Sequence, residues 1–373
     1  MGHTLTEPLS FDFKAGISPD KAERIIAALG ADEFPNRNVV LTFKEYPYVN
    51  AGVAWRIGNA LRRYSGGALE VEVPPFSEGQ GKWFQSFTRS ALGDAIAAHA
   101  ARIVSGGEDI TEQVKQYYAA FSERQSQNGV LWGELHRGIS VNPEREDQFR
   151  EQLLKSLKYV NVRPTHFHPE RLQDLIKLVF EAIQNVYDHA RRRPLPSETK
   201  IVSYFLLRYY NKIQDHHPDP QGRLKAYTTR LPALTTRART DFIEICVNDD
   251  GVGIAARQTQ DPTVYWGAKT REAEAVQEAL KTNSSVKLRA QDTRVRGTPG
   301  QGFTYIDASL RALRAFAVLR TGRLLAILDG TSELAEGFTL LDVELGYMPG
   351  TTLDILVPIL KDGDGLPSLF ADE

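Results

Sequence analysis

The stretch DFIEICVNDDGVGI, residues 241–254, decides the fold of the second half of this chain. Its first eight residues, 241–248, are rich in apolar and β-branched side chains and predict a buried strand. Asp249, Gly251 and Gly253 follow at once, so the strand runs into an acidic turn that contains glycine. The glycines let the backbone come close to a flat ring or a phosphate. The carboxylate of Asp249 can accept a hydrogen bond from an exocyclic amine, which suits adenine.

Two other interpretations also fit this turn. Asp-Gly is common in hairpin turns, so the segment can be a simple connection. The spacing of Gly251, Gly253 and Ala256 after a strand also imitates the dinucleotide-binding fingerprint. That fingerprint needs an apolar helix to open immediately, whereas RQTQDP over 257–262 is a poor helix start. The sequence therefore disfavours a dinucleotide site.

A long amphipathic helix is predicted over roughly 168–192, with Pro169 in a favourable first-turn position. Glu181 and Asn185 are spaced by four, so they share one face, and Asp188 and His189 extend that face by another turn. An amide oxygen is a suitable ligand for Mg²⁺, and a carboxylate one turn away could orient or deprotonate a water. Taken alone, the pattern also fits a polar stripe open to solvent.

A glycine-rich segment, GTPGQGF over 297–303, precedes a helix predicted over 303–317. Gly297, Gly300 and Gly302 would present backbone N–H groups and a positive helix end to phosphates. A P-loop would need lysine where Phe303 stands, so that motif is absent. A flexible loop is the simpler alternative. The last segment, PGTTLDILVP over 349–358, reads as a turn and a strand that begins near Thr351.

Together, and in this order, the four segments resemble the N-box, the two glycine boxes and the closing strand of the GHKL (gyrase, heat-shock chaperone, histidine kinase, mismatch-repair) ATP-binding domains. The resemblance covers roughly residues 165–360. It implies an α/β fold, a two-layer sandwich of the Bergerat type with a mixed sheet covered on one face by helices. The polar stretch 255–301 would form the mobile lid of such a domain.

The resemblance also implies roles for individual residues. Asn185 would ligate Mg²⁺, Glu181 would act as general base, and Asp249 would accept from the adenine amino group with support from Thr351 through water. Binding of ATP would further involve these positions of the motifs: Asp188, His189, Gly251, Gly253, Ile254, Gly297, Gly300, Gly302 and Phe303. His189 stands where the kinase branch also carries a histidine, which favours a supporting role over phosphate acceptance. Lys287, Arg294 and Arg296 in the lid are candidates for contacting the γ-phosphate.

The N-terminal part, 1–145, is expected to form a smaller α/β interaction domain ahead of the ATP-binding domain, 146–360, and a polar tail, 361–373. Within it, 35–105 loosely resembles a STAS module, with a strand, a loop, a helix and a second strand. The switch form of that module carries Ser or Thr shortly before a glycine. Here Asn50 and Ala51 precede Gly52, so no phosphorylation switch is expected. An unrelated α/β interaction domain is the alternative.

The composition is that of an ordinary globular protein, with 42% hydrophobic and 25% charged residues in a chain of 373. A net charge of -2 gives no indication of nucleic acid as a partner. No apolar run approaches the roughly 18–20 residues needed to span a bilayer, and the N-terminus lacks a signal pattern, so a cytoplasmic protein without membrane contact is expected. Cys246 stands in an apolar run and is expected to be buried.

The leading hypothesis is an ATP-dependent conformational switch with slow ATPase activity. A Ser/Thr protein kinase of the anti-sigma type and a non-catalytic ATP sensor or adaptor are the alternatives. ATP and Mg²⁺ are the implied ligands, and a protein partner is expected to bind through the N-terminal domain. Self-association into a homodimer is left open.

Overall fold

The computed structural model divides the chain into two compact units. The first unit comprises 1–125, 215–218 and 344–349, and the second comprises 126–214, 219–343 and 350–373. The structure describes residues 8–13, 17–30, 37–44, 51–64, 67–75, 96–97, 99–121, 130–134, 146–186, 203–210, 220–231, 240–281, 302–332 and 337–360. The division falls at 125/126, so the strand at 130–134 belongs to the second unit.

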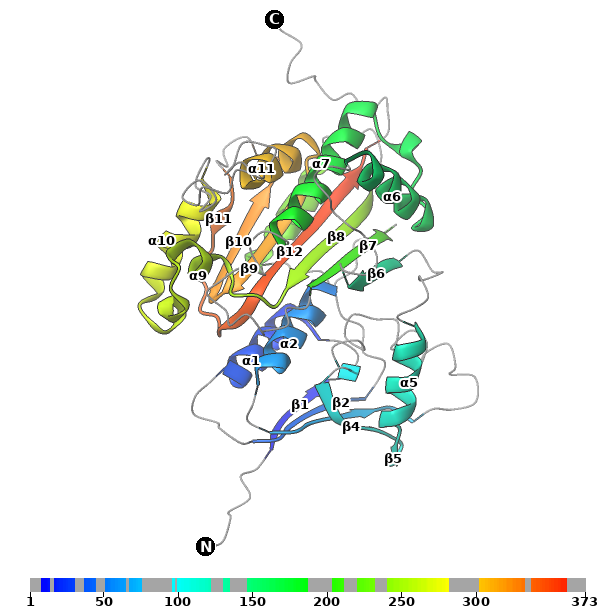
Figure 1. The fold of residues 1–373 in the computed structure, drawn as a ribbon, viewed down its shortest axis with the longest axis vertical. Helices are drawn as coiled ribbons and strands as arrows, with labels where there is room; N and C mark the ends of the chain where they lie inside the picture. The colour runs from blue at the N-terminus through cyan, green and yellow to red at the C-terminus, as the bar shows by residue number, and fades with distance from the viewer. Residues whose placement is uncertain are drawn as a thin grey trace, which may run out of the picture. The chain divides into compact units, whose positions relative to one another are not determined.

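The first unit contains a five-stranded sheet in the order β1-β2-β3-β4-β5. The first four strands are parallel and β5 pairs antiparallel with β4, so this sheet is mixed. Helices α1 and α2 pack against each other (Figure 1). The elements are β1 (Leu9–Phe13), α1 (Pro19–Gly30), β2 (Val39–Phe43), α2 (Ala51–Arg63), β3 (Leu69–Val73), β4 (Ala100–Ser105), β5 (Glu108–Asp109) and α5 (Thr111–Phe121).

Helix α2 is where the sequence predicted a helix, and it is buried along its whole length from Gly52 to Leu61. Its buried Arg56 lies 3.7 Å from the carboxylate of Glu23 on α1, which pairs the charge inside the unit. The Ala-rich stretch 81–104 predicts one or two helices, but β4 begins at Ala100, where the chain pairs in parallel with β3 and buries Ala100 and Ile103. Most of that expected stretch lies outside the described residues.

The second unit contains a seven-stranded sheet in the order β11-β10-β9-β12-β8-β7-β6 (Figure 1). The pairings of β6 with β7, β7 with β8, β8 with β12, β9 with β10, and β10 with β11 are antiparallel. A mixed sheet had been expected in this half, and it is found in the first unit instead. The strands are β6 (Val130–Glu134), β7 (Ser203–Tyr210), β8 (Asp241–Asp249), β9 (Phe316–Gly322), β10 (Leu324–Asp329), β11 (Thr339–Leu340) and β12 (Met348–Ile359).

The helical elements of the second unit include the long helix expected from the sequence, now α7. They are α6 (Glu146–Tyr159), η2 (Pro164–His166), α7 (Pro169–Asn185), η4 (Pro220–Gly222), α8 (Arg223–Arg230), α9 (Ile254–Thr259), η6 (Pro262–Trp266), α10 (Lys269–Leu280) and α11 (Gly302–Ala312). In the part of the chain that the structure describes, no helix is both long and apolar enough to cross a membrane.

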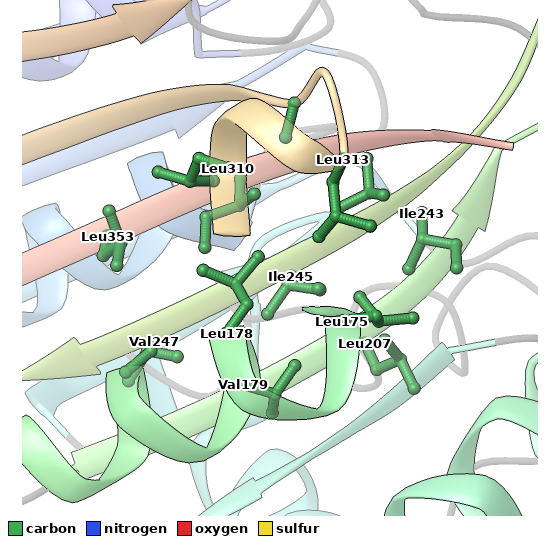
Figure 2. Close-up of a cluster of buried hydrophobic side chains, with 14 of the residues drawn as sticks. Leu175, Leu178, Val179, Leu207, Ile243, Ile245, Val247, Leu310, Leu313 and Leu353 are labelled. Carbon is green, nitrogen blue, oxygen red and sulfur yellow. The ribbon is translucent and has the colours of Figure 1, made fainter. Parts of the chain in front are cut away.

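The core of this unit lies between one face of the sheet and the helices α6, α7 and α11. Figure 2 shows leucine and valine side chains of α7 packed toward apolar side chains of β7, β8 and β12. In Figure 2, Leu175 of α7 and Ile243 of β8 lie on the right of the view. Leu178, later in α7, and Val247, later in β8, both lie further to the left. Helix α7 and strand β8 therefore run in the same direction. Helix α11 runs oppositely, since the side chain of Arg171 at the start of α7 donates to the carbonyl of Leu313 at 2.8 Å.

Three local differences from the sequence expectation have physical causes. The helix expected over 303–317 ends at Ala312 because Arg314 takes a left-handed conformation, φ 52°, and the chain turns into β9. The Pro, Asp and Thr residues of 211–238 predict an irregular connection, but the segment contains α8, whose Tyr227 packs on Phe316 and donates to the carbonyl of Arg314. The run FTLLDVEL over 338–345 predicts a strand, but β11 has only Thr339 and Leu340 because only these two residues pair with β10.

A helical segment, α9-η6-α10, follows β8 in the region expected to form the lid. Glu272 of α10 is fully buried and accepts from the backbone N–H of Arg323 at 2.6 Å and from its Nε at 2.7 Å. The backbone of the β9–β10 turn is thereby tied to α10. Residues 282–301, the rest of the expected lid, lie outside the described residues.

Replacing Glu272 by alanine should lower the free energy of unfolding on the order of 3 kcal/mol, because it leaves the guanidinium of Arg323 and a backbone N–H without their acceptor. Urea denaturation followed by tryptophan fluorescence measures this, since Trp266 lies in the adjoining η6. Glu278→Ala on the same helix is the matched control. Its side chain is 54% exposed, and its loss should change stability by less than about 0.5 kcal/mol.

Candidate functional site

The helix-facing side of the large sheet changes from apolar to polar at one end. Val247 of β8 pairs with Phe205 of β7 and with Leu353 of β12, which makes one apolar row of the core. Two residues further along β8, Asp249 pairs with Ser203 and with Thr351. Because side chains alternate along a strand and paired residues share a face, this polar row continues the same face of the sheet.

Thr321 of β9 extends the polar row to a fourth strand. Its Oγ1 lies 3.4 Å from Oγ1 of Thr351 and donates to the carbonyl of Gly350 at 3.2 Å. The same oxygen accepts from the backbone N–H of Ile254 at 3.1 Å. One hydroxyl therefore fastens the loop after β8 to the strand that carries Thr351. The sequence indicates only a hairpin turn at Thr321, because hairpin spacing says nothing about which strand lies beside it.

The loop after β8 depends on Gly253. Its φ of 76° lies in the left-handed region, and a Cβ there would come within 2.4 Å of the Tyr265 hydroxyl. That hydroxyl donates to the carbonyl of Val252 at 2.7 Å and accepts from the backbone N–H of Ala256 at 3.2 Å. Tyr265 of η6 thus holds the loop from outside, a role that the sequence did not reveal.

A short helix, α9, opens directly after Gly253, although the sequence had been judged a poor helix start there. It lasts six residues and ends at Gln260, which has a left-handed conformation. This helix does not restore the dinucleotide interpretation. Both neighbours of β8 run antiparallel to it, whereas a dinucleotide fold requires parallel strands joined through helices.

Asp249 is buried at the centre of the polar row. Its Oδ1 accepts from the backbone N–H of Gly251 at 2.8 Å. The pKa of the carboxyl is raised to about 7 as the net result of burial, which raises it most, hydrogen bonds from the backbone of Gly251 and Thr351, which lower it, and the neighbouring charge of Asp250, which raises it. The group therefore titrates near neutral pH, where a carboxylate can serve as a strong acceptor.

Two segments far apart in sequence meet beside the helices. A Cβ added at Gly302, the first residue of α11, would come within 2.8 Å of Oδ1 of Asn185 on α7. The Nδ2 of Asn185 is buried and has no hydrogen-bond partner among the described residues. The first N–H groups of a helix lack partners within the helix, so the start of α11 brings backbone donors close to this amide.

These groups gather at the same end of the unit. Helix α7 and strand β8 run in parallel directions and end at Asn185 and Asp249, and α11 begins at this end because it runs oppositely (Figures 1 and 2). Glu181, one turn before Asn185 on α7, is half-buried. The arrangement thus combines an acceptor, hydroxyl groups, an amide and a helix N-terminus within the second unit.

Some of the remaining predicted site residues lie in the described part of the chain, and the others lie outside it. Ile254 and Phe303 are partly buried against the hydrophobic core, and Phe303 packs edge-to-face on Phe338 with ring centroids 6.5 Å apart. Gly251 follows β8 and makes the hydrogen bond to Asp249. The following predicted residues lie outside the described residues: Asp188, His189, Lys287, Arg294, Arg296, Gly297 and Gly300.

Comparisons with protein-family models, with curated proteins and with solved structures find no match to this chain. Within the described ranges no group of three or more His, Cys, Asp and Glu side chains is placed to hold a metal ion.

The titration of Asp249 predicts an unusual pH dependence of stability. The pKa in the folded state, about 7, lies above the ordinary value of 3.8, so the folded protein holds a proton that the unfolded chain has lost between these values. Stability from this group is therefore lost as the pH rises from about 4 to about 7. Asp249→Asn, which keeps an acceptor for Gly251, should be more stable than wild type at pH 8 by an amount on the order of 2–4 kcal/mol and nearly equal at pH 4.5.

Chemical denaturation at the two pH values measures this difference. Asp261→Asn is a control of opposite sign, because hydrogen bonds from Thr263 lower the pKa of Asp261. A constant difference between Asp249→Asn and wild type across this pH range would contradict the assignment of the titration to Asp249.

Proposed function

We propose that the second unit binds ATP together with Mg²⁺ in a fold of the Bergerat type and acts as an ATP-dependent switch with slow hydrolysis. One observation carries the proposal: the buried acceptor Asp249 and the junction of Asn185 with the start of α11 occupy the same end of the unit. These are groups that the resemblance assigns to the adenine, to Mg²⁺ and to the phosphates. Their assembly from three separate segments, β8, α7 and the start of α11, supports that assignment.

The adenine end of the proposed site is the polar row. The carboxylate of Asp249 would accept from the exocyclic amine, and Thr351, directly opposite in the register, would support it. Gly253 keeps the loop beside Asp249 in its conformation, since a side chain there would collide with the Tyr265 hydroxyl. Thr321 fixes both sides of this end before the nucleotide arrives, which reduces the ordering cost of binding.

The phosphate end is formed by α7 and α11. Mg²⁺ is commonly held by one or two protein groups together with phosphate oxygens and waters, so a single amide oxygen from Asn185 is an adequate protein contribution. Buried polar groups normally have partners, and the Nδ2 of Asn185 has none among the described residues. A ligand at this place would supply one. The N-terminus of α11 favours negative charge in the same position.

Hydrolysis would use Glu181. Its carboxylate would accept a proton from a water as the water oxygen attacks the γ-phosphorus, and the bond to the β–γ bridging oxygen would break to leave ADP and phosphate. Positioning and charge stabilisation carry most of such a reaction. Transfer to a Ser or Thr hydroxyl of a partner would use the same groups with a different acceptor, so the kinase stays the alternative, as does a sensor that binds without turnover.

Asn185→Ala should weaken binding of a non-hydrolysable ATP analogue in the presence of Mg²⁺ by at least about tenfold, or roughly 1.4 kcal/mol. Binding without Mg²⁺ should change much less, because the amide acts through the metal. Titration calorimetry with and without Mg²⁺ measures both. Gln173→Ala removes an exposed amide from the same helix and is the control. Equal Mg²⁺-dependent affinity in wild type and Asn185→Ala would remove Asn185 from the metal site.

Glu181→Gln should lower the rate of phosphate release by about 10²–10⁴-fold while leaving the affinity for the analogue within about threefold, because the change removes the base and keeps the side-chain shape. Glu170→Gln, at an exposed position of the same helix, is the control. With ATP labelled at the γ-phosphate, free phosphate indicates an ATPase and a labelled protein indicates a kinase. Binding without either product would identify a sensor.

A further inference from the structure

Ser203, the first residue of β7, has a hydroxyl that its surroundings do not explain. The residue is fully buried, and its Oγ has no hydrogen-bond partner within the described part of the chain. Leaving a hydroxyl buried without a partner costs free energy, and buried polar side chains are mostly satisfied. A buried serine of this kind is retained at a cost unless something outside the protein completes its hydrogen bonding.

The register places this hydroxyl next to the acceptor of the proposed adenine site. Ser203 pairs directly with Asp249, and the two side chains share the helix-facing side of the sheet. Opposite residues of an antiparallel pair have Cβ atoms about 4.5–5.5 Å apart, which is close enough for both side chains to reach one flat ring. A carboxylate acceptor and a hydroxyl that can donate therefore stand side by side.

We propose that Ser203 is a further nucleotide-binding residue whose hydroxyl donates to a ring nitrogen of the adenine beside the amine that Asp249 accepts from. The inference rests on the proposed function. In adenine the exocyclic amine is flanked by two acceptors, N1 and N7, so a donor next to an acceptor matches that edge. Guanine carries a carbonyl oxygen in place of the amine, which would face the carboxylate of Asp249 acceptor to acceptor. The pair Ser203–Asp249 thereby selects 6-aminopurines.

Removing the hydroxyl should change the stability of the free protein in opposite directions for a ligand-binding serine and for a structural serine. If Ser203 serves the ligand, Ser203→Ala relieves an unpartnered group in the free protein, and the melting temperature rises by about 2–4 °C. The same change weakens nucleotide binding about three- to tenfold. A structural serine would lose stability on the same substitution. Ser105→Ala is the matched control, because the hydroxyl of this buried strand residue donates to the carbonyl of Pro74 at 2.9 Å and its loss should lower stability without affecting binding.

The decisive experiment replaces the ring nitrogens of the ligand. Dissociation constants of ADP, 1-deaza-ADP and 7-deaza-ADP with Mg²⁺ are measured for wild type and Ser203→Ala. For wild type, one of the two deaza analogues should bind about three- to tenfold more weakly than ADP, and for Ser203→Ala that penalty should vanish. Coupling to 1-deaza-ADP identifies N1 as the acceptor, and coupling to 7-deaza-ADP identifies N7.

The failures of the two proposals are distinguishable. If wild type binds no adenine nucleotide, the proposed function falls and the role of Ser203 falls with it. If wild type binds ADP and Ser203→Ala binds all three ligands with wild-type affinities, only the role of Ser203 is overturned. A Ser203→Ala protein that is less stable than wild type, or that does not fold, also contradicts the inference, because it would reveal a structural hydroxyl.

Discussion

The second unit depends on burying a carboxylate at the end of a hydrophobic core. Asp249 is buried where the rows of apolar side chains between α7 and β8 end, and this burial is the main reason that its pKa is raised to about 7. The cost is tolerated because the rows behind it bury a large apolar surface, and burial of that kind is the main favourable contribution to folding. An acid at the end of such a core lowers the stability of the fold compared with a leucine there. In return, the fold gains a fixed hydrogen-bond acceptor.

The acceptor is useful only if the loop beside it stays in place. That loop is held from two sides, by Thr321 from within the sheet and by Tyr265 from the helical segment after it. Glu272 in turn fastens that helical segment to the turn that follows Thr321. These hydrogen bonds hold the loop around Gly253 from several sides, so the loop is ordered in the absence of a ligand. Binding then carries no free-energy cost for ordering it.

Periodic segments were predictable and lateral neighbours were not. The apolar stripe of α7 and the strand 241–248 follow from side-chain spacing alone, and the motifs at Asn185 and Asp249 followed from residue types. The places of Ser203 and Thr321 beside Asp249 and Thr351 could not be predicted, because they depend on which strands pair and in which register. Local sequence does not specify that register. Helix α8 escaped because its stability comes from packing on β9 and not from a periodic pattern.

Several polar groups at this end share one energetic feature. The hydroxyl of Ser203 and the amide nitrogen of Asn185 are buried without partners in the described structure, and the carboxyl of Asp249 has a raised pKa. Each of these costs stability in the protein alone. A buried side-chain oxygen without a partner also occurs elsewhere in the described residues, on Gln152 of α6, but here three costly groups share one end of the unit. A single ligand with donor, acceptor and anionic groups would satisfy all three, and its binding would then stabilise the fold by linkage.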